Sequence, residues 1–163
     1  MVKIFILYGN SEGEKYAKYI DKHFKQNGLD SFLASYGSPD VRVGGEFQKK
    51  IDIELENADI VIIVVTAGLR RSVAAMDEIN RILGMTVSPP IIPYVKGNTQ
   101  LPIEIIGRQV LSFKKSNVNT TAKKNELELT MWRTLDSHRR EMSITPEQYQ
   151  PQIQSYGPIE VQR

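Results

Sequence analysis

Residues 58–78 read ADIVIIVVTAGLRRSVAAMDE, and this stretch decides the expected fold. Its first part, Ile60–Val65, is a continuous β-branched run without polar alternation, which is typical of a strand buried on both faces of a parallel sheet. A polar turn follows, and Ser72 is suited to cap a helix because its hydroxyl can accept hydrogen bonds from first-turn amides. The helix is expected to run to about Leu83 and to end at Gly84. The stretch therefore predicts a strand–loop–helix unit built on a central parallel strand.

Glu78 falls at the edge of the apolar stripe of this expected helix. The stripe consists of Ala75, Met76, Ile79, Ile82 and Leu83. At roughly 100° per residue, Asp77 points to the solvated side, whereas Glu78 shares the border with Arg71 and Ala74. Helix geometry alone favours an ordinary surface glutamate with a packed stem and a hydrated head. The alternative is a functional carboxylate beside a ligand crevice.

Composition limits the classes of protein to consider. The 163 residues are about one domain's worth. Lys and Arg number 21 and Asp and Glu 19, and the net charge of +2 comes without a long basic block, so no nucleic-acid partner is expected. With no cysteines and two isolated histidines, His23 and His138, we expect neither disulfides nor a metal site. The sequence shows no secretion signal or membrane-length apolar run, so we expect a cytoplasmic protein without a membrane partner.

Further apolar runs predict four more strands around the central one. They lie near residues 3–8, 29–34, 91–95 and 109–113. Helical stripes alternate with them, and the last helix is expected from Thr121 to about Met142, with Trp132 as an anchor in the core. This alternation favours a mostly parallel sheet with right-handed crossovers and helices on both faces.

Residues 36–45 form a loop that is longer than the usual connection in an α/β unit. It contains three glycines and one proline, and it is either functional or a mobile or decorative insertion. The helix that follows it has Phe47, Ile51, Leu55 and Ala58 at the spacing of a buried stripe.

Residues 143–163 change in composition and are expected to form a tail outside a domain of residues 1–142. They contain three prolines and five glutamines, and their apolar residues follow no helical or strand period. Such a segment is either disordered or extended over its own domain or a neighbouring one, and we expect the docked form.

Several motifs resemble, in order, those of one known family. Phe5-Ile6-Leu7-Tyr8 is similar to its first strand, Gly28-Leu29 through Phe32 to its second strand, and residues 36–45 to its BB loop. Gly45-Glu46-Phe47, Ile51, Ile53 and Asn57-Ala58-Asp59 are similar to its glycine-led helix and the approach to its third strand. Ser72 and Glu78 match the outer positions of its Ser/Trp/Cys/Glu helix motif. Over roughly residues 3–140 the chain thus resembles the TIR (Toll/interleukin-1 receptor) domain, as a divergent, stand-alone member of the prokaryotic type.

The resemblance implies a flavodoxin-like α/β fold and a place for the active site. The five-stranded parallel sheet would have the order 2-1-3-4-5, with a ligand crevice at the switch point beside residues 9–12. In enzymatic TIR domains a glutamate at the place of Glu78 is required to cleave the nicotinamide–ribose bond of NAD, and an aromatic residue at the place of Phe47 lines the crevice. A fixed carboxylate suits this reaction because it stabilises the positive charge that develops on the ribose. NAD is then the substrate, and no cofactor is expected.

The resemblance also implies substrate-binding positions. Tyr8, Gly9, Asn10 and Ser11 would border the ribose and the diphosphate, and Arg42 or Arg71 would meet phosphate charge. Three positions differ from the family pattern: Ala74 stands for the usual tryptophan, Gly9 for a polar residue, and Ala34 for the frequent acidic residue ending the second strand. In this family the crevice is commonly completed by oligomerisation, so the resemblance implies self-association or pairing with another TIR domain.

Three classes of function stay open from the sequence. The first is an NAD-consuming TIR enzyme, hydrolysing or cyclising the ADP-ribosyl product as a defence or signalling effector. The second is a non-catalytic module that pairs with other TIR domains through residues 36–45. The third is a nucleotide-binding protein related to nucleoside deoxyribosyltransferases. A role of Glu78 in turnover separates the first two.

Overall fold

Five parallel strands form the sheet of this computed structural model. They are β1 (Lys3–Leu7), β2 (Asp30–Leu33), β3 (Ile60–Val65), β4 (Ile91–Lys96) and β5 (Leu111–Phe113). Their order is β2-β1-β3-β4-β5, and each neighbouring pair is parallel. The predicted flavodoxin-like order and the central place of the β-branched run are confirmed.

The structure describes residues 1–34 and 46–143, without the side chains of Glu46, Phe47 and Ser143. Residues 36–45, which include Arg42, and the expected tail beyond Ser143 therefore lie outside the described residues. Within the described ranges, no helix has both the length and the apolar character needed to cross a membrane.

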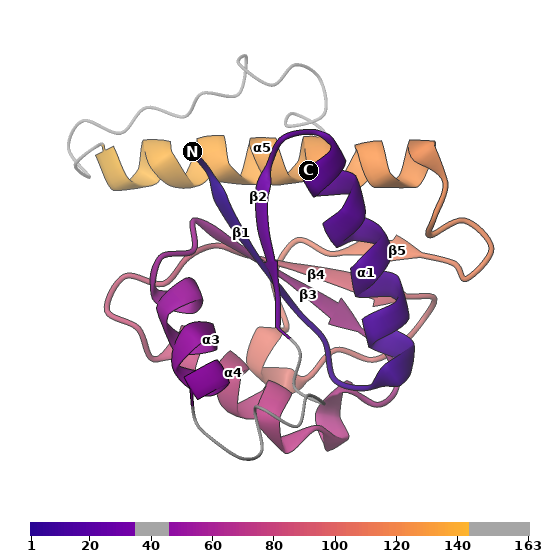
Figure 1. Cartoon of the computed structure of the whole chain (residues 1–163), viewed down its shortest axis with the longest axis horizontal. Coiled ribbons are helices and arrows are strands. Elements are labelled where there is room, and N and C mark those ends of the chain that lie inside the picture. The colour runs from indigo at the N-terminus through magenta and orange to yellow at the C-terminus, as the bar shows by residue number, and fades with distance from the viewer. Residues whose placement is uncertain (35–45, 144–163) are drawn as a thin grey trace.

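Four α-helices in the described ranges cover the two faces of the sheet. They are α1 (Ser11–Gln26), α3 (Glu46–Glu56), α4 (Val73–Leu83) and α5 (Thr121–Ser143), with short 3-10 helices η1 (Leu69–Arg71) and η2 (Ile103–Ile105). Helices α1 and α5 pack on one face, and α3 and α4 pack on the other (Figure 1). The prediction of helices on both faces is thus confirmed.

Strand β3 explains why the sequence shows no polar alternation. All of its residues are buried, because successive side chains point to opposite faces and both faces are covered. One alternate set, Ile60, Ile62 and Val64, lies in the core under α1 and α5. The other set, Val61, Ile63 and Val65, lies in the core under α3 and α4.

Helix α5 has the predicted bounds but a narrower buried face than expected. Leu127, Met131 and Leu135 are buried at a spacing of four residues. Trp132 keeps 37% of its surface exposed and Met142 keeps 61%, so the prediction of a tryptophan core anchor is wrong. The reason is that α5 lies on the sheet along a single stripe, and a residue one step from Met131 is turned about 100° away from it.

Candidate functional site

The carboxyl ends of β1 and β3 meet at the switch point of the sheet, and Asn10 joins the loops that follow them. Asn10 is the N-cap of α1, where its Oδ1 accepts a hydrogen bond from the Gly13 amide at 3.0 Å. The same oxygen accepts a hydrogen bond from the Thr66 hydroxyl at 3.1 Å. One side chain therefore caps a helix and fixes the start of the loop after β3.

Two glycines allow these loops to pack closely. A Cβ atom on Gly9 would lie 2.5 Å from the Cα of Leu69 in η1. A Cβ atom on Gly68 would lie 2.0 Å from Nδ2 of Asn10. Both distances are far below van der Waals contact, so glycine at each position is required by the contact between the two loops.

Tyr8 does not point toward α4. Its side chain is buried in the core under α1 and α5, and its hydroxyl donates a hydrogen bond to Oε2 of Glu14 at 2.6 Å. This hydrogen bond is the main cause of the lowered pKa of Glu14. The structure thus brings Gly9, Asn10 and the exposed Ser11 to the switch point, but it directs Tyr8 to the face of the sheet opposite α3 and α4.

Glu78 is buried on α4. The helix begins as predicted, since the Ser72 hydroxyl accepts a hydrogen bond from the Ala75 amide at 3.2 Å, and Gly84 is its C-cap. Glu78 is only 5% exposed, whereas Asp77 is exposed. The interpretation of Glu78 as a border residue with a hydrated head is therefore wrong.

The two oxygens of Glu78 differ in their surroundings. Oε1 accepts a hydrogen bond of 3.0 Å from Nε2 of Gln48 on α3. Oε2 is buried and has no hydrogen-bond partner among the residues that the structure describes. One oxygen is therefore held in place, and the other has an unused capacity to accept a hydrogen bond.

Gln48 belongs to a polar seam between α3 and α4. Its amide also donates to Oδ1 of Asp52 at 3.0 Å, and Asp52 is paired with Arg81 of α4. Arg81 reaches Glu56 as well, at 3.2 Å. Arg81 is thus shared between two carboxylates, and through Gln48 the seam holds Glu78 in position.

Burial raises the pKa of Glu78. The hydrogen bond from Gln48 and the charge of Arg81 oppose this rise, while the negative charges of Asp52 and Asp77 add to it. A carboxylate of this kind keeps a strong electric field when it is ionised, because little water screens it.

The remaining predicted positions are only partly described. Arg71, the last residue of η1, is exposed, and Ala74 is half-buried in the first turn of α4. Phe47 lies in α3 directly before Gln48, but its side chain is outside the described residues. The described residues contain no group of three or more His, Asp or Glu side chains arranged to hold a metal ion.

Sequence reasoning missed Gln48, which donates a hydrogen bond to the Glu78 carboxylate. The available signal was its spacing of four residues from Asp52 on a predicted helix, which places both polar side chains on one side. That spacing indicates a local pair, but it does not indicate contact with α4.

The family model of the TIR domain matches residues 4–129, which is most of the chain. The chain belongs to the TIR domain family. A search of curated proteins found no match. The matched part of this TIR domain contains the switch-point loops, the α3–α4 seam and Glu78.

Two departures of this TIR domain from the family pattern have structural reasons. Gly9 is required by its contact with Leu69. Ala34 is fully buried in the core under α3 and α4, so an acidic side chain there would place a charge among apolar groups. The structure offers no comparable reason for Ala74.

Proposed function

We propose that this TIR domain cleaves the nicotinamide–ribose bond of NAD, with Glu78 as the catalytic carboxylate. The observation that carries the proposal is the asymmetric hydrogen bonding of the buried Glu78 carboxylate: Oε1 is held by Gln48, and Oε2 has no hydrogen-bond partner among the described residues. A buried carboxylate oxygen without a partner costs stability unless a ligand uses it. The surroundings of Glu78 are those expected of a site that keeps one oxygen for its substrate.

The proposed chemistry needs one carboxylate and no acid. When the N-glycosidic bond breaks, its electron pair goes to the nicotinamide nitrogen, and nicotinamide leaves as a neutral molecule. Positive charge develops on the ribose, where the Glu78 carboxylate stabilises it or holds a ribose hydroxyl. In hydrolysis, water then bonds to the ribose carbon and loses a proton, giving ADP-ribose. In cyclisation, a nitrogen of the adenine of the same molecule forms that bond instead.

The proposed substrate-binding residues lie mainly near the switch point of the sheet. The loop after β1, with Gly9, Asn10 and Ser11, would border the ribose and diphosphate. The exposed Arg71 could bind a phosphate oxygen. Phe47 and Arg42 keep their proposed roles on the family resemblance alone. On the same basis, the protein would act in the cytoplasm as a defence or signalling effector, and assembly with a second TIR domain would complete the crevice.

A non-catalytic TIR interaction module is the second candidate. The half-buried Ala74 favours it, because an alanine supplies no aromatic wall for nicotinamide where the family usually has tryptophan. This candidate predicts TIR–TIR association without NAD turnover.

The deciding experiment incubates the purified full chain at high concentration with NAD and measures free nicotinamide. We expect turnover by the wild type and a decrease of about a hundredfold or more in Glu78→Gln, which keeps the shape of the side chain and removes its charge. Asp77→Asn is the matched control, since Asp77 is the exposed neighbour on the same helix and should retain activity. Equal rates in Glu78→Gln and the wild type contradict the catalytic assignment, and an inactive but assembled wild type supports the interaction module.

A further inference from the structure

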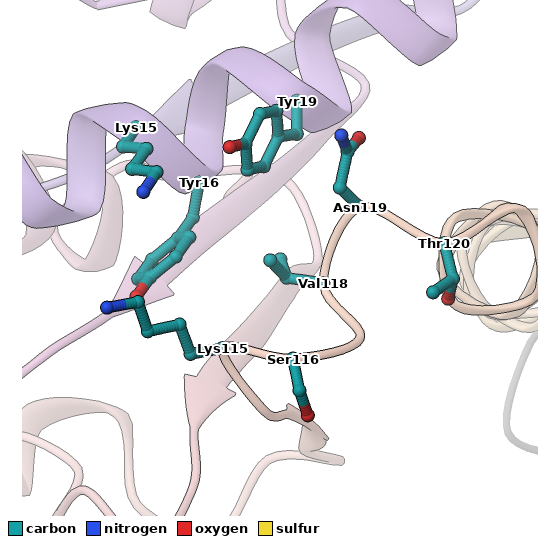
Figure 2. Close-up of a pocket in the computed structure, with 8 residues that line it drawn as sticks. All are labelled: Lys15, Tyr16, Tyr19, Lys115, Ser116, Val118, Asn119 and Thr120. Atoms are coloured by element: carbon teal, nitrogen blue, oxygen red, sulfur yellow. The ribbon is translucent and has the colours of Figure 1, made fainter.

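A cavity of about 250 Å³ lies between α1 and residues 114–120, which join β5 to α5 (Figure 2). Its lining includes Lys15, Tyr16 and Tyr19 from α1 and Lys115, Val118 and Asn119 from the joining segment. Tyr16 and Val118 belong to the core under α1 and α5, whereas Glu78 contacts α3 on the other side of the sheet. The cavity is therefore separate from the proposed catalytic site.

The joining segment is held by its own hydrogen bonds. The Lys114 carbonyl accepts from the amides of Asn117 and Val118, each at 3.0 Å, and the Asn117 side chain accepts from the Lys114 amide at 2.8 Å. Val118 is 2% exposed and anchors the segment in the core. This wall of the cavity is therefore formed before any ligand binds, so little ordering cost is expected on binding.

Aromatic and aliphatic side chains form the inner surface of the cavity. Tyr16 is buried and packs edge-on against Phe113, with ring centroids 5.1 Å apart, and Tyr19 is half-buried. Figure 2 shows the side chain of Val118 pointing from the segment toward the tyrosines of α1. Tyr16 and Val118 are each only 2% exposed, so the half-buried ring of Tyr19 is the surface that can contact the flat or apolar part of a small molecule.

Two lysines bring positive charge to the cavity. Lys15 and Lys115 are exposed and form no ion pair with an acidic side chain in the described part of the chain. Figure 2 shows Lys115 extending toward the hydroxyl end of Tyr16, with Lys15 approaching from α1. Asn119 accepts a hydrogen bond from Lys124 through Oδ1 at 3.3 Å, which leaves its amide group to donate.

A third lysine, Lys96, lies near Tyr16 but is paired with an acidic residue. Lys96 lies 5.7 Å from the centroid of the Tyr16 ring and is bound to Glu12 at 2.5 Å. Glu12 lies one helical turn before Tyr16. Because Glu12 is paired with Lys96, it does not neutralise the charge of Lys15 or Lys115. The positive charges of Lys15 and Lys115 beside the ring of Tyr19 favour an anion attached to a planar or sugar-like body.

We propose that this cavity binds a small phosphorylated compound up to the size of a mononucleotide, with the phosphate at Lys15 and Lys115 and the remainder against Tyr19. At about 250 Å³ the cavity is smaller than the roughly 300–1,000 Å³ that is typical of small-molecule sites, so a mononucleotide is the upper limit for its ligand. The proposal does not depend on NAD cleavage.

The test is calorimetric titration of the full chain with AMP, ribose 5-phosphate, inorganic phosphate and adenosine. We expect saturable binding of AMP and ribose 5-phosphate, with adenosine at least about tenfold weaker because it lacks the charge. The double variant Lys15→Gln, Lys115→Gln should weaken AMP binding by about tenfold to a hundredfold. The control Lys22→Gln, Lys49→Gln removes two other exposed lysines and should change AMP binding by no more than about twofold.

A further measurement shows where AMP binds. Because AMP is also part of NAD, the place where AMP binds must be measured to separate this cavity from the proposed catalytic site. In NMR spectra, AMP should shift the methyl signals of Val118. The proposal is overturned if AMP and ribose 5-phosphate do not bind at millimolar concentration, or if adenosine or inorganic phosphate binds as tightly as AMP. It is equally overturned if the double variant binds AMP like the wild type, or if the control variant loses binding to the same extent.

Discussion

Gln48 on α3 donates a 3.0 Å hydrogen bond to Glu78 on α4, and its second donated hydrogen bond goes to Asp52, also at 3.0 Å. A side-chain amide has two hydrogens to donate, so Gln48 uses both of them between two carboxylates. Arg81 of α4 forms an ion pair with Asp52. The charge state and position of Glu78 therefore depend on a residue of a different helix.

Replacing Gln48 with leucine should lower NAD turnover by about tenfold or more while the protein stays folded. The substitution removes the described donor to the Glu78 carboxylate, and a hydrogen bond to a charged group contributes about 1.5–3 kcal/mol. The pKa of Glu78 should rise further, so the acidic limb of the pH–rate profile should move to higher pH. Lys49→Leu, one residue away and exposed, is the control. A normal rate with an unmoved acidic limb in Gln48→Leu would show that Gln48 does not position Glu78.

Glu78→Gln should stabilise the protein at neutral pH while it removes activity. Because burial raises the pKa of Glu78, the native state binds more protons than the unfolded state between the unfolded and the folded pKa. Wild-type stability therefore falls as pH rises through this window, and the variant lacks this loss. We expect a gain of roughly 0.5–2 kcal/mol in the free energy of unfolding at neutral pH, shrinking toward acidic pH. Urea unfolding at several pH values measures it, and a variant that is less stable at neutral pH contradicts the prediction.

Gly68→Ala should destabilise the fold by about 1–3 kcal/mol. The added methyl group would overlap the side chain of Asn10, which cannot move freely because it caps α1 and binds Thr66. Gly84→Ala is the control, since its Cβ would meet nothing closer than the Asn80 carbonyl at 3.4 Å. Thermal unfolding compares the two variants, and equal melting temperatures would argue against the close loop contact.

The contact between Gly68 and Asn10 predicts that substitutions at these two positions have non-additive effects on stability. Asn10→Ala alone should cost about 1 kcal/mol through loss of the helix cap. Combined with Gly68→Ala, it should remove the overlap, so the double variant should be more stable than the sum of the single effects predicts. Additive losses in a double-mutant cycle would show that the two residues do not interact.

Tyr94→Phe should leave the stability unchanged or raise it by about 1 kcal/mol. The Tyr94 hydroxyl is buried, and within the described ranges it has no hydrogen-bond partner, so its removal relieves an unsatisfied group. The matched substitution Tyr8→Phe removes the 2.6 Å hydrogen bond to Glu14 and should cost about 1–2 kcal/mol. Urea unfolding of both variants tests the contrast, which fails if Tyr94→Phe is the more destabilising change.

The local elements of the fold could be predicted because they depend on short-range rules. The unbroken β-branched run of Ile60–Val65 required a strand covered on both sides, and Ser72 and Gly84 marked the ends of α4. Alternation of strands and helices then limited the sheet to a parallel one, and the order of motifs indicated the TIR family and its strand order.

The site depended on contacts that no local pattern contains. Helical periodicity gives the angle of Glu78 around its own helix axis, but its burial depends on how α3 packs across that face and places Gln48 against it. The same limit explains the exposed Trp132, because periodicity cannot tell how wide a stripe of α5 the sheet covers. The sequence by itself therefore determined the strands, the helices and their order. Only the tertiary structure decided which polar groups lost their water, because desolvation depends on neighbours that are distant in the chain.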